Sequence, residues 1–175
     1  MADAFVDSQR PSGLPAYAHE SSGVNERLRT ITFETAASDA AGDVKRLFTV
    51  GAHEIPVRCL VMCDAIAGAT DIDLGLYRPS APDGSTTGVV VDRDALMDGT
   101  DISAGKAWSD QVDGLSALGV EERGTKTFYD IANDVQTADV IGHLPQDSYD
   151  FCLTEVSEVS AAGTITIFLW TIDKQ

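Results

Sequence analysis

Positively charged residues are scarce in this sequence, with 12 Lys and Arg against 28 Asp and Glu and a formal net charge of −16. Binding to a nucleic-acid backbone depends on clustered cations, so this composition argues against a nucleic-acid partner. Long apolar runs are missing as well, and none approaches the roughly 18 residues that a membrane-spanning helix needs. Residues 1–5 lack the basic start and the apolar core of a secretory signal. We therefore expect no nucleic acid and no membrane among the partners.

Cysteine is rare too, and its number is odd, with Cys59, Cys63 and Cys152 among 175 residues. Cys59 and Cys63 lie on one face of a predicted strand about 13 Å apart, which is too far for a disulfide. A bridge from either of them to Cys152 remains open. Buried reduced thiols are the favoured interpretation, and they fit a chain that stays in a reducing compartment.

Catalytic patterns are missing from the sequence. The histidines His19, His53 and His143 are isolated from one another. The nearest approach to a serine nucleophile elbow, around Ser116, has its second glycine one place late. A catalytic triad of residues that are distant in the sequence but adjacent in the fold is a minor alternative. We expect no enzyme activity and no cofactor.

Carboxylates are abundant, and the best candidate for a metal site is the acidic cluster of Asp92, Asp94, Asp98 and Asp101. Clustered carboxylates can hold calcium, but an EF-hand loop counted from Asp92 has Met97 where a glycine is required. Solvated acidic side chains are the favoured interpretation. We therefore expect no bound metal and keep the four aspartates as weak candidates.

Apolar and polar residues alternate in many segments of this chain. Residues 71–77 show it most clearly, because Ile72, Leu74 and Leu76 face one way and Pro79 ends the strand soon afterwards. An exposed, turn-rich loop at 80–87 leads to an apolar strand at 88–91, which returns beside the first. The other predicted strands are residues 27–35, 44–50, 55–62, 149–156 and 164–172.

Two pairs of predicted strands resemble each other. Residues 55–62 and 71–77 flank a small-residue turn, and so do residues 149–156 and 164–172. Each pair has the pattern of a β-hairpin, so we expect one hairpin in each of two packed sheets.

Helical patterns are short. Residues 92–99 place helix formers between an aspartate and Gly99, which predicts one helical turn with a glycine stop. Residues 127–135 carry apolar residues at helical spacing and predict a second short helix. The predicted fold class is therefore mainly β, an antiparallel β-sandwich of jelly-roll-like type with one or two short helices.

Residues 1–26 differ from the rest, because they contain Pro11, Pro15 and Ser-rich stretches and show no apolar period. A flexible tail is one interpretation. We favour an extended N-terminal arm at residues 1–26 that orders on a partner, followed by one β-sandwich domain at residues 27–175. The expected partner-contact residues are Phe5, Val6, Arg10, Leu14, Tyr17, Arg27 and Arg29.

Three segments resemble structural proteins of tailed bacteriophages. Residues 71–77, DIDLGLY, and residues 88–99, GVVVDRDALMDG, resemble a D-x-D-L-G-L-Y strand followed by a G-V-V-x-D-x-D-x-L-x-D-G segment in that family. A strand pair similar to residues 149–154 and 161–166 also occurs there. The family includes head decoration, or cement, proteins, which are commonly β-rich, often trimeric and bound to the outer capsid surface.

The resemblance implies a non-enzymatic virion protein, and most directly a capsid decoration protein that stabilises the head through its N-terminal arm. It implies the major capsid protein as partner, a homo-oligomer that we expect to be a trimer, and a place on the capsid surface after assembly in the host cytoplasm. The alternative is a tail-associated or carbohydrate-binding receptor module. Such a module would use Trp108 and Tyr77, a sugar platform that Tyr129 could extend, together with the acidic cluster.

Overall fold

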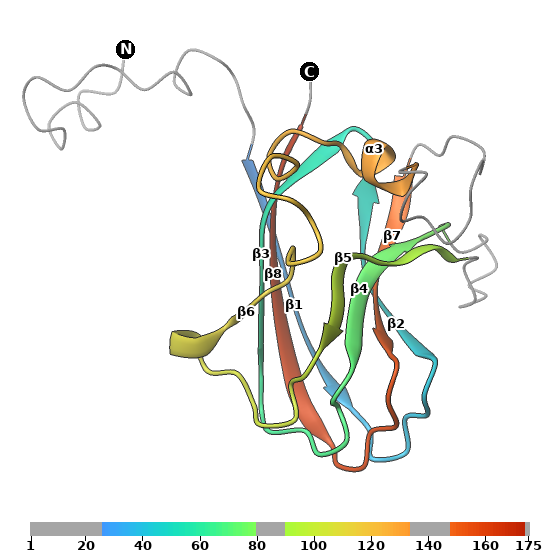
Figure 1. Ribbon diagram of the computed structural model, residues 1–175, viewed down its shortest axis with the longest axis vertical. Helices are drawn as coiled ribbons and strands as arrows, with labels where there is room; N and C mark the ends of the chain where they lie inside the picture. Colours follow the sequence, from blue (N-terminus) through green and yellow to red (C-terminus); the bar gives the residue numbers. More distant parts are fainter. Residues whose placement is uncertain (1–25, 80–89, 134–147, 174–175) are drawn as a thin grey trace, which may run out of the picture.

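The computed structural model describes residues 26–79, 90–133 and 148–173. These ranges contain eight strands, one short α-helix and one 3-10 turn (Figure 1). The first strands are β1 (Glu26–Thr35), β2 (Asp43–Gly51), β3 (Glu54–Cys63), β4 (Ile72–Tyr77) and β5 (Val90–Thr100). They are followed by η1 (Trp108–Asp110), β6 (Val112–Asp113), α3 (Phe128–Ala132), β7 (Ser148–Glu155) and β8 (Gly163–Asp173).

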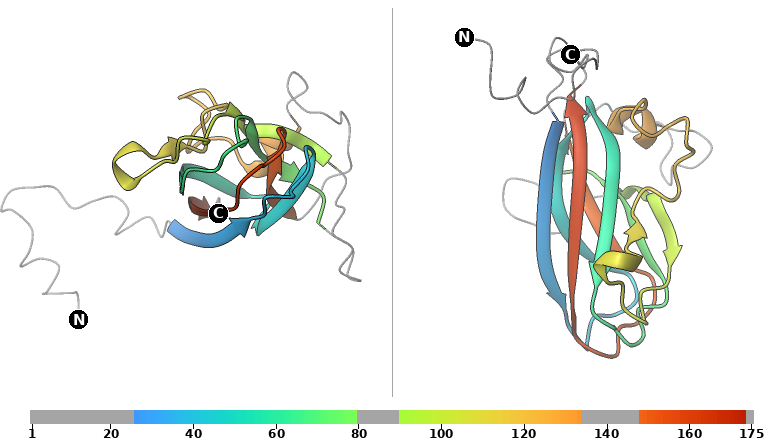
Figure 2. Two further views of the ribbon diagram at one scale, coloured as in Figure 1. Left: turned by 90° about the horizontal axis from the view of Figure 1, so that it is seen from below. Right: turned by 90° about the vertical axis from the view of Figure 1, so that its left-hand side faces the viewer.

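The strands form two antiparallel sheets of four strands each, in the orders β1-β8-β3-β6 and β2-β7-β4-β5, which face each other (Figures 1 and 2). Their pairing is nested: β4 pairs with β5, β3 with β6, β2 with β7 and β1 with β8. This is one long hairpin rolled up so that successive pairs alternate between the sheets, which is the jelly-roll arrangement. The predicted fold class is therefore confirmed.

The hairpin expected across residues 71–91 is present as β4 and β5, but the two similar hairpins of the prediction are wrong. Strand β3 lies in the first sheet and β4 in the second, and β7 and β8 are divided in the same way. The connections after β3 and β7 are therefore corners between the sheets. A strand-turn-strand pattern is the same for a hairpin and for a corner, because both need only two strands and a turn.

The helical turn predicted at residues 92–99 is also wrong, because this segment belongs to β5. It pairs with β4 through several register shifts, and Leu96 and Met97 are fully buried in the core. Gly99 has φ of 60°, and its N–H donates to the Asp73 carboxylate at 2.9 Å. The ladder with β4 and the burial of apolar residues outweigh a local helix propensity that is worth only tenths of a kcal/mol per residue.

The second predicted helix is confirmed as α3. Thr127 and Asp130 cap it reciprocally, because the Thr127 side chain accepts from the Asp130 N–H and the Asp130 side chain accepts from the Thr127 N–H. The helix places Phe128 and Ile131 in the core. It ends at Ala132. Among the described residues, no helix is long and apolar enough to cross a membrane.

The core lies between the two sheets and follows the alternation of the strands. In β8, Ile165, Ile167 and Leu169 are buried, while the residues between them are half-buried on the outer face. The central strands β4 and β7 are buried along nearly their whole length. The largest fully buried side chains, Tyr149, Phe128 and Phe151, are aromatic.

The predicted domain boundary stays a prediction, because most of the arm lies outside the described residues. Only Glu26, which opens β1, belongs to the described part. The contact residues Phe5, Val6, Arg10, Leu14 and Tyr17, and the loop at 80–87, also lie outside it.

Candidate interaction surface

The outer face of the first sheet carries aromatic side chains from its second strand, β8. Phe168 and Trp170 point outward because they alternate with the buried Ile167 and Leu169. Trp170 lies opposite Leu28 of β1 on one side and Arg58 of β3 on the other. The right-hand view of Figure 2 looks onto this face and shows β1, β8 and β3 side by side with η1 in front of β3.

Trp108 of η1 joins these two side chains and completes what we call the aromatic patch, Trp108, Phe168 and Trp170. The Trp108 and Phe168 rings meet edge to face with centroids 6.1 Å apart, and the Phe168 and Trp170 rings are stacked with centroids 6.1 Å apart. The Arg58 guanidinium lies 5.3 Å from the centroid of the Trp170 ring. Contacts of these kinds hold the rings in defined orientations.

The aromatic patch is open to solvent at its edges. Trp108 is 65% exposed, and the neighbouring Leu28 is 53% exposed. A hollow of about 500 Å³ adjoins Trp108, between η1 with its preceding loop and the ends of β3 and β8. Aromatic rings beside arginine are the composition that protein interfaces favour, so this face is the candidate interaction surface.

The sugar platform of the sequence prediction is not assembled. Tyr77 is 6% exposed in the second sheet, and its hydroxyl is 2.7 Å from the Thr154 hydroxyl in a hydrogen bond. Tyr129 packs against the core from α3. Trp108 instead contacts Phe168, which stacks on Trp170 in turn, and the sequence prediction did not include either of these two residues. The signal was present in residues 164–172, where both aromatic residues share the polar face of the predicted strand.

The predicted contact residues Arg27 and Arg29 lie in an ionic cluster at the end of the first sheet. Two guanidinium nitrogens of Arg29 donate to the two carboxylate oxygens of Glu54, each at 2.7 Å. Thr171 donates to the same carboxylate at 2.7 Å, and Arg27 pairs with Asp173 at 2.8 Å. Arg29 thus has an internal partner, and whether either arginine also contacts another protein stays a prediction.

Glu54 is charged despite being buried. Burial alone would raise the pKa of Glu54, but hydrogen bonds from Arg29, Thr171 and the Gly51 N–H hold that pKa below its ordinary value. The cluster therefore ties β1, β3 and β8 together through one carboxylate.

The acidic cluster is spread along β5 and the turn after it. Asp92 is buried, Asp94 is half-buried, and Asp98 and Asp101 are exposed. The Asp101 carboxylate accepts the Ser103 N–H at 2.8 Å as part of the turn. Because the segment is a strand with register shifts and not a helical loop, these side chains do not form the single ligand set that an EF-hand provides.

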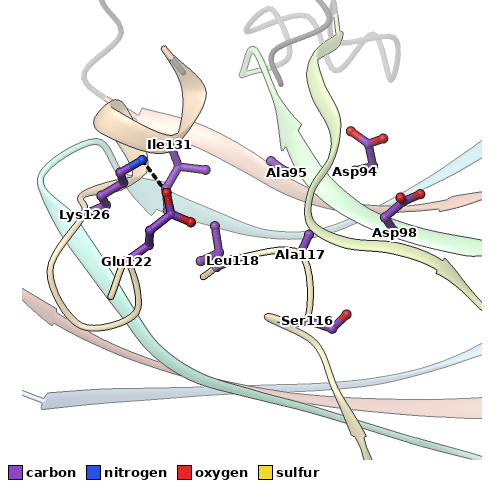
Figure 3. A pocket seen from close by; sticks show the side chains of 9 residues that line it. All are labelled: Asp94, Ala95, Asp98, Ser116, Ala117, Leu118, Glu122, Lys126 and Ile131. Atoms are coloured by element: carbon purple, nitrogen blue, oxygen red, sulfur yellow. Dashed lines mark hydrogen bonds and ion pairs between the residues drawn. The ribbon is translucent and has the colours of Figure 1, made fainter. Parts of the chain in front are cut away.

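Asp94 and Asp98 face a pocket of about 540 Å³ between β5, the 116–126 segment and α3 (Figure 3). Lys126 pairs with Glu122 across one side of it at 2.5 Å. Figure 3 shows that Ser116 points away from that pair. The residues that line the pocket include no histidine, so the described structure gives the serine no base of that type there.

All three cysteines are free thiols, and Cys59 and Cys152 are buried as the favoured interpretation expected, whereas Cys63 is half-buried. Burial raises the pKa of Cys152 to about 12. The pKa of Cys59 is raised by burial as well. Thiols in this state are poor nucleophiles and act as small core residues.

The chain is similar to known proteins in its fold and not in its sequence. No protein-family model matches the chain, and no curated protein matches it. Among solved structures, a chain of the capsid of Ralstonia phage GP4 superimposes with a TM-score of 0.54 and 15% identity, over 95% of this chain and 92% of that one. A chain of the capsid asymmetric unit of cyanophage Pam1 has a TM-score of 0.49 and 9% identity, over 95% and 96%. The chain therefore shares its overall fold with the chain from the GP4 capsid.

Proposed function

We propose that this chain is a non-enzymatic structural protein of a tailed-phage virion, and more narrowly a capsid decoration protein that binds the outer capsid surface and stabilises the head. The observation that carries the proposal is the aromatic patch, exposed on the outer face of a jelly roll. The fold shared with a chain of the Ralstonia phage GP4 capsid supports the virion role. The major capsid protein is the expected partner.

The first sheet offers two means of attachment. The proposed arm, residues 1–26, ends where β1 begins at Glu26, and β1 is an edge strand of the sheet order. An edge strand can accept a further strand through its backbone hydrogen bonds, and an extended arm can do the same on a neighbour. Many shallow contacts from a trimer would add up through avidity.

Deletion of residues 1–25 is expected to abolish binding to capsids and to leave the domain folded, because the deletion leaves every strand that the structure describes intact. Co-sedimentation with capsids that lack the protein measures the binding, and circular dichroism checks the fold. A variant that replaces Ser21 and Ser22 by alanine is the control and should bind like the wild type. If the truncated protein binds capsids as well as the wild type does, the arm is not what attaches the protein to the capsid.

Replacement of Trp108 by alanine is expected to weaken capsid binding by roughly tenfold or more, the usual effect of losing an aromatic anchor at an interface. Because Trp108 is 65% exposed, the free energy of unfolding should change by less than about 1 kcal/mol. Val120→Ala is the matched control, since Val120 is an apolar residue that is 85% exposed and does not belong to the aromatic patch. Equal binding of the two variants would show that the aromatic patch faces solvent on the particle.

The alternative is a tail-associated or carbohydrate-binding receptor module, and one observation favours it: the exposed Trp108 borders a hollow of about 500 Å³. Indole rings beside a hollow can stack on sugars. Calorimetry with host-surface glycans tests this function, and no heat would end it. Micrographs of labelled protein on phage particles distinguish the head from the tail.

A further inference from the structure

Three acidic side chains meet at the end of the sandwich where the chain crosses between sheets, opposite the end at which β1 begins (Figure 1). Asp39 lies in the β1–β2 corner, Asp43 opens β2, and Glu155 ends β7. Asp43 and Glu155 are partners in the β2–β7 ladder, and the Gly42 N–H donates to the Glu155 carbonyl at 2.7 Å. One carboxylate oxygen from each of the three lies within 4.8 Å of the other two.

Glu155 is the unusual member of this group. It is 1% exposed, and within the described parts of the chain neither of its carboxylate oxygens has a hydrogen-bond partner. The buried acids Glu54 and Asp150, by contrast, are each paired with an arginine. Burying a carboxylate without a partner is costly, so an unpaired one at a cluster of oxygens points to a positively charged ligand.

The two aspartates retain ligand capacity. The Asp39 Oδ2 atom accepts the Ala36 N–H at 2.7 Å and pairs with Lys45 at 2.7 Å. The Asp43 Oδ2 atom accepts the Ala40 N–H at 2.9 Å. These contacts fix both side chains through one oxygen and leave the Oδ1 atoms for a ligand. Three carboxylates against one lysine leave two negative charges, which a divalent cation neutralises.

We propose that Asp39, Asp43 and Glu155 form a binding site for a divalent cation, with Ca²⁺ as the best fit. Ca²⁺ binds oxygen ligands at about 2.3–2.6 Å, so two ligands of one ion lie at most about 5 Å apart, and the observed spacing satisfies this limit. Ca²⁺ also accepts irregular geometry and additional waters, whereas Mg²⁺ requires a near-ideal octahedron. A bound ion would fasten the β1–β2 corner to the end of β7.

The test uses the full chain after treatment with EDTA and dialysis. Titration with CaCl₂ in a calorimeter is expected to show one site per chain, and CaCl₂ should raise the midpoint of thermal unfolding. MgCl₂ should bind more weakly. Glu155→Gln keeps the shape of the side chain and should weaken Ca²⁺ binding at least about tenfold. Asp43→Asn alters a more exposed ligand and should have the same effect, which keeps the test valid if the first variant fails to fold.

Asp98→Asn is the matched control, because Asp98 belongs to the separate acidic cluster on β5 and is exposed. It should bind Ca²⁺ as the wild type does. The proposal is overturned if the wild type shows neither heat nor a shifted midpoint at 10-fold molar excess and above, up to millimolar CaCl₂. It is equally overturned if Glu155→Gln and Asp43→Asn bind normally, or if only Asp98→Asn loses binding. Tighter binding of Mg²⁺ than of Ca²⁺ would overturn the choice of ion.

Discussion

Replacement of Arg29 by methionine is expected to lower the free energy of unfolding by about 3 kcal/mol, because it leaves the buried carboxylate of Glu54 without its main cation. Methionine keeps much of the length and apolar surface of the side chain, so the effect isolates the lost charge. Urea-induced unfolding at neutral pH measures it. Adding Glu54→Gln to the same variant should restore at least about 1 kcal/mol, since the stranded charge is then removed.

The stability of Arg29→Met and of the wild type should also depend on pH in different ways. In the wild type the pKa of Glu54 lies below its ordinary value near 4.5, so this group stabilises the fold above pH 4.5, and that contribution is lost as the pH falls through the lower folded value. In Arg29→Met, burial acts with less opposition and raises the pKa of Glu54. Acidification then protonates the buried Glu54 of the variant and removes its destabilising charge, whereas in the wild type acidification removes the stabilising contribution of Glu54.

The difference in unfolding free energy between the two proteins should therefore shrink between pH 7 and pH 4. Lys126→Met is the control, because its ion pair with Glu122 involves a lysine whose side chain is 35% exposed. Ion pairs that stay partly in contact with water contribute at most about 1 kcal/mol to stability, so the gap between this variant and the wild type should stay small at every pH. A constant gap between Arg29→Met and the wild type would contradict the role given to Glu54.

Replacement of Gly75 by alanine is expected to be similarly damaging, with a loss of about 3 kcal/mol in unfolding free energy. A Cβ atom at this position of β4 would lie 2.1 Å from the Arg93 carbonyl oxygen and 2.2 Å from that of Asp92. Both atoms belong to the backbone of β5, so the clash can be relieved only by moving the strand. Thermal unfolding and urea titration of the variant measure the loss.

Gly119→Ala is the matched control. A Cβ atom at Gly119 would also approach another atom closely, but that atom is the Glu121 carboxylate oxygen at 2.7 Å, at the far end of an exposed side chain. The side chain can rotate away, so the variant should lose less than about 1 kcal/mol. Equal losses in Gly75→Ala and Gly119→Ala would show that the two strands separate more easily than their packing indicates.

The sequence is sufficient to predict most of the strands, because their alternation is local and persists over several residues. Residues 164–172, for example, carry the period of two that β8 shows in its burial. The short strand β6 and the greater part of β5 lack that alternation and were not predicted. Which sheet a strand joins is a long-range property. Strand β7 pairs with β2 on one side and with β4 on the other, and the residues near β7 in the sequence do not indicate which strands these will be. For that reason the corner before β8 resembles a hairpin in sequence.

The same distinction applies to the surfaces. Trp108 could be selected from the sequence as a notable aromatic residue, but its contact with Phe168 depends on a 3-10 turn that crosses the outer face of the first sheet. Glu155 lies in a predicted strand like any other polar residue. Its proximity to Asp39 and Asp43 appears only when β7 and β2 are paired.

The nested pairing has a consequence for how the chain folds. β1 and β8 are the first and last strands of the described residues, and they pair along the whole length of β1, from Glu26 with Ile172 to Thr35 with Gly163. During synthesis β1 emerges long before β8 and cannot complete its sheet until β8 has appeared. Such distant contacts slow folding and leave apolar strand surface exposed in the meantime. β1 carries four charged residues, and charged side chains disfavour pairing of an unpaired strand with another chain. These residues are Glu26, Arg27, Arg29 and Glu34.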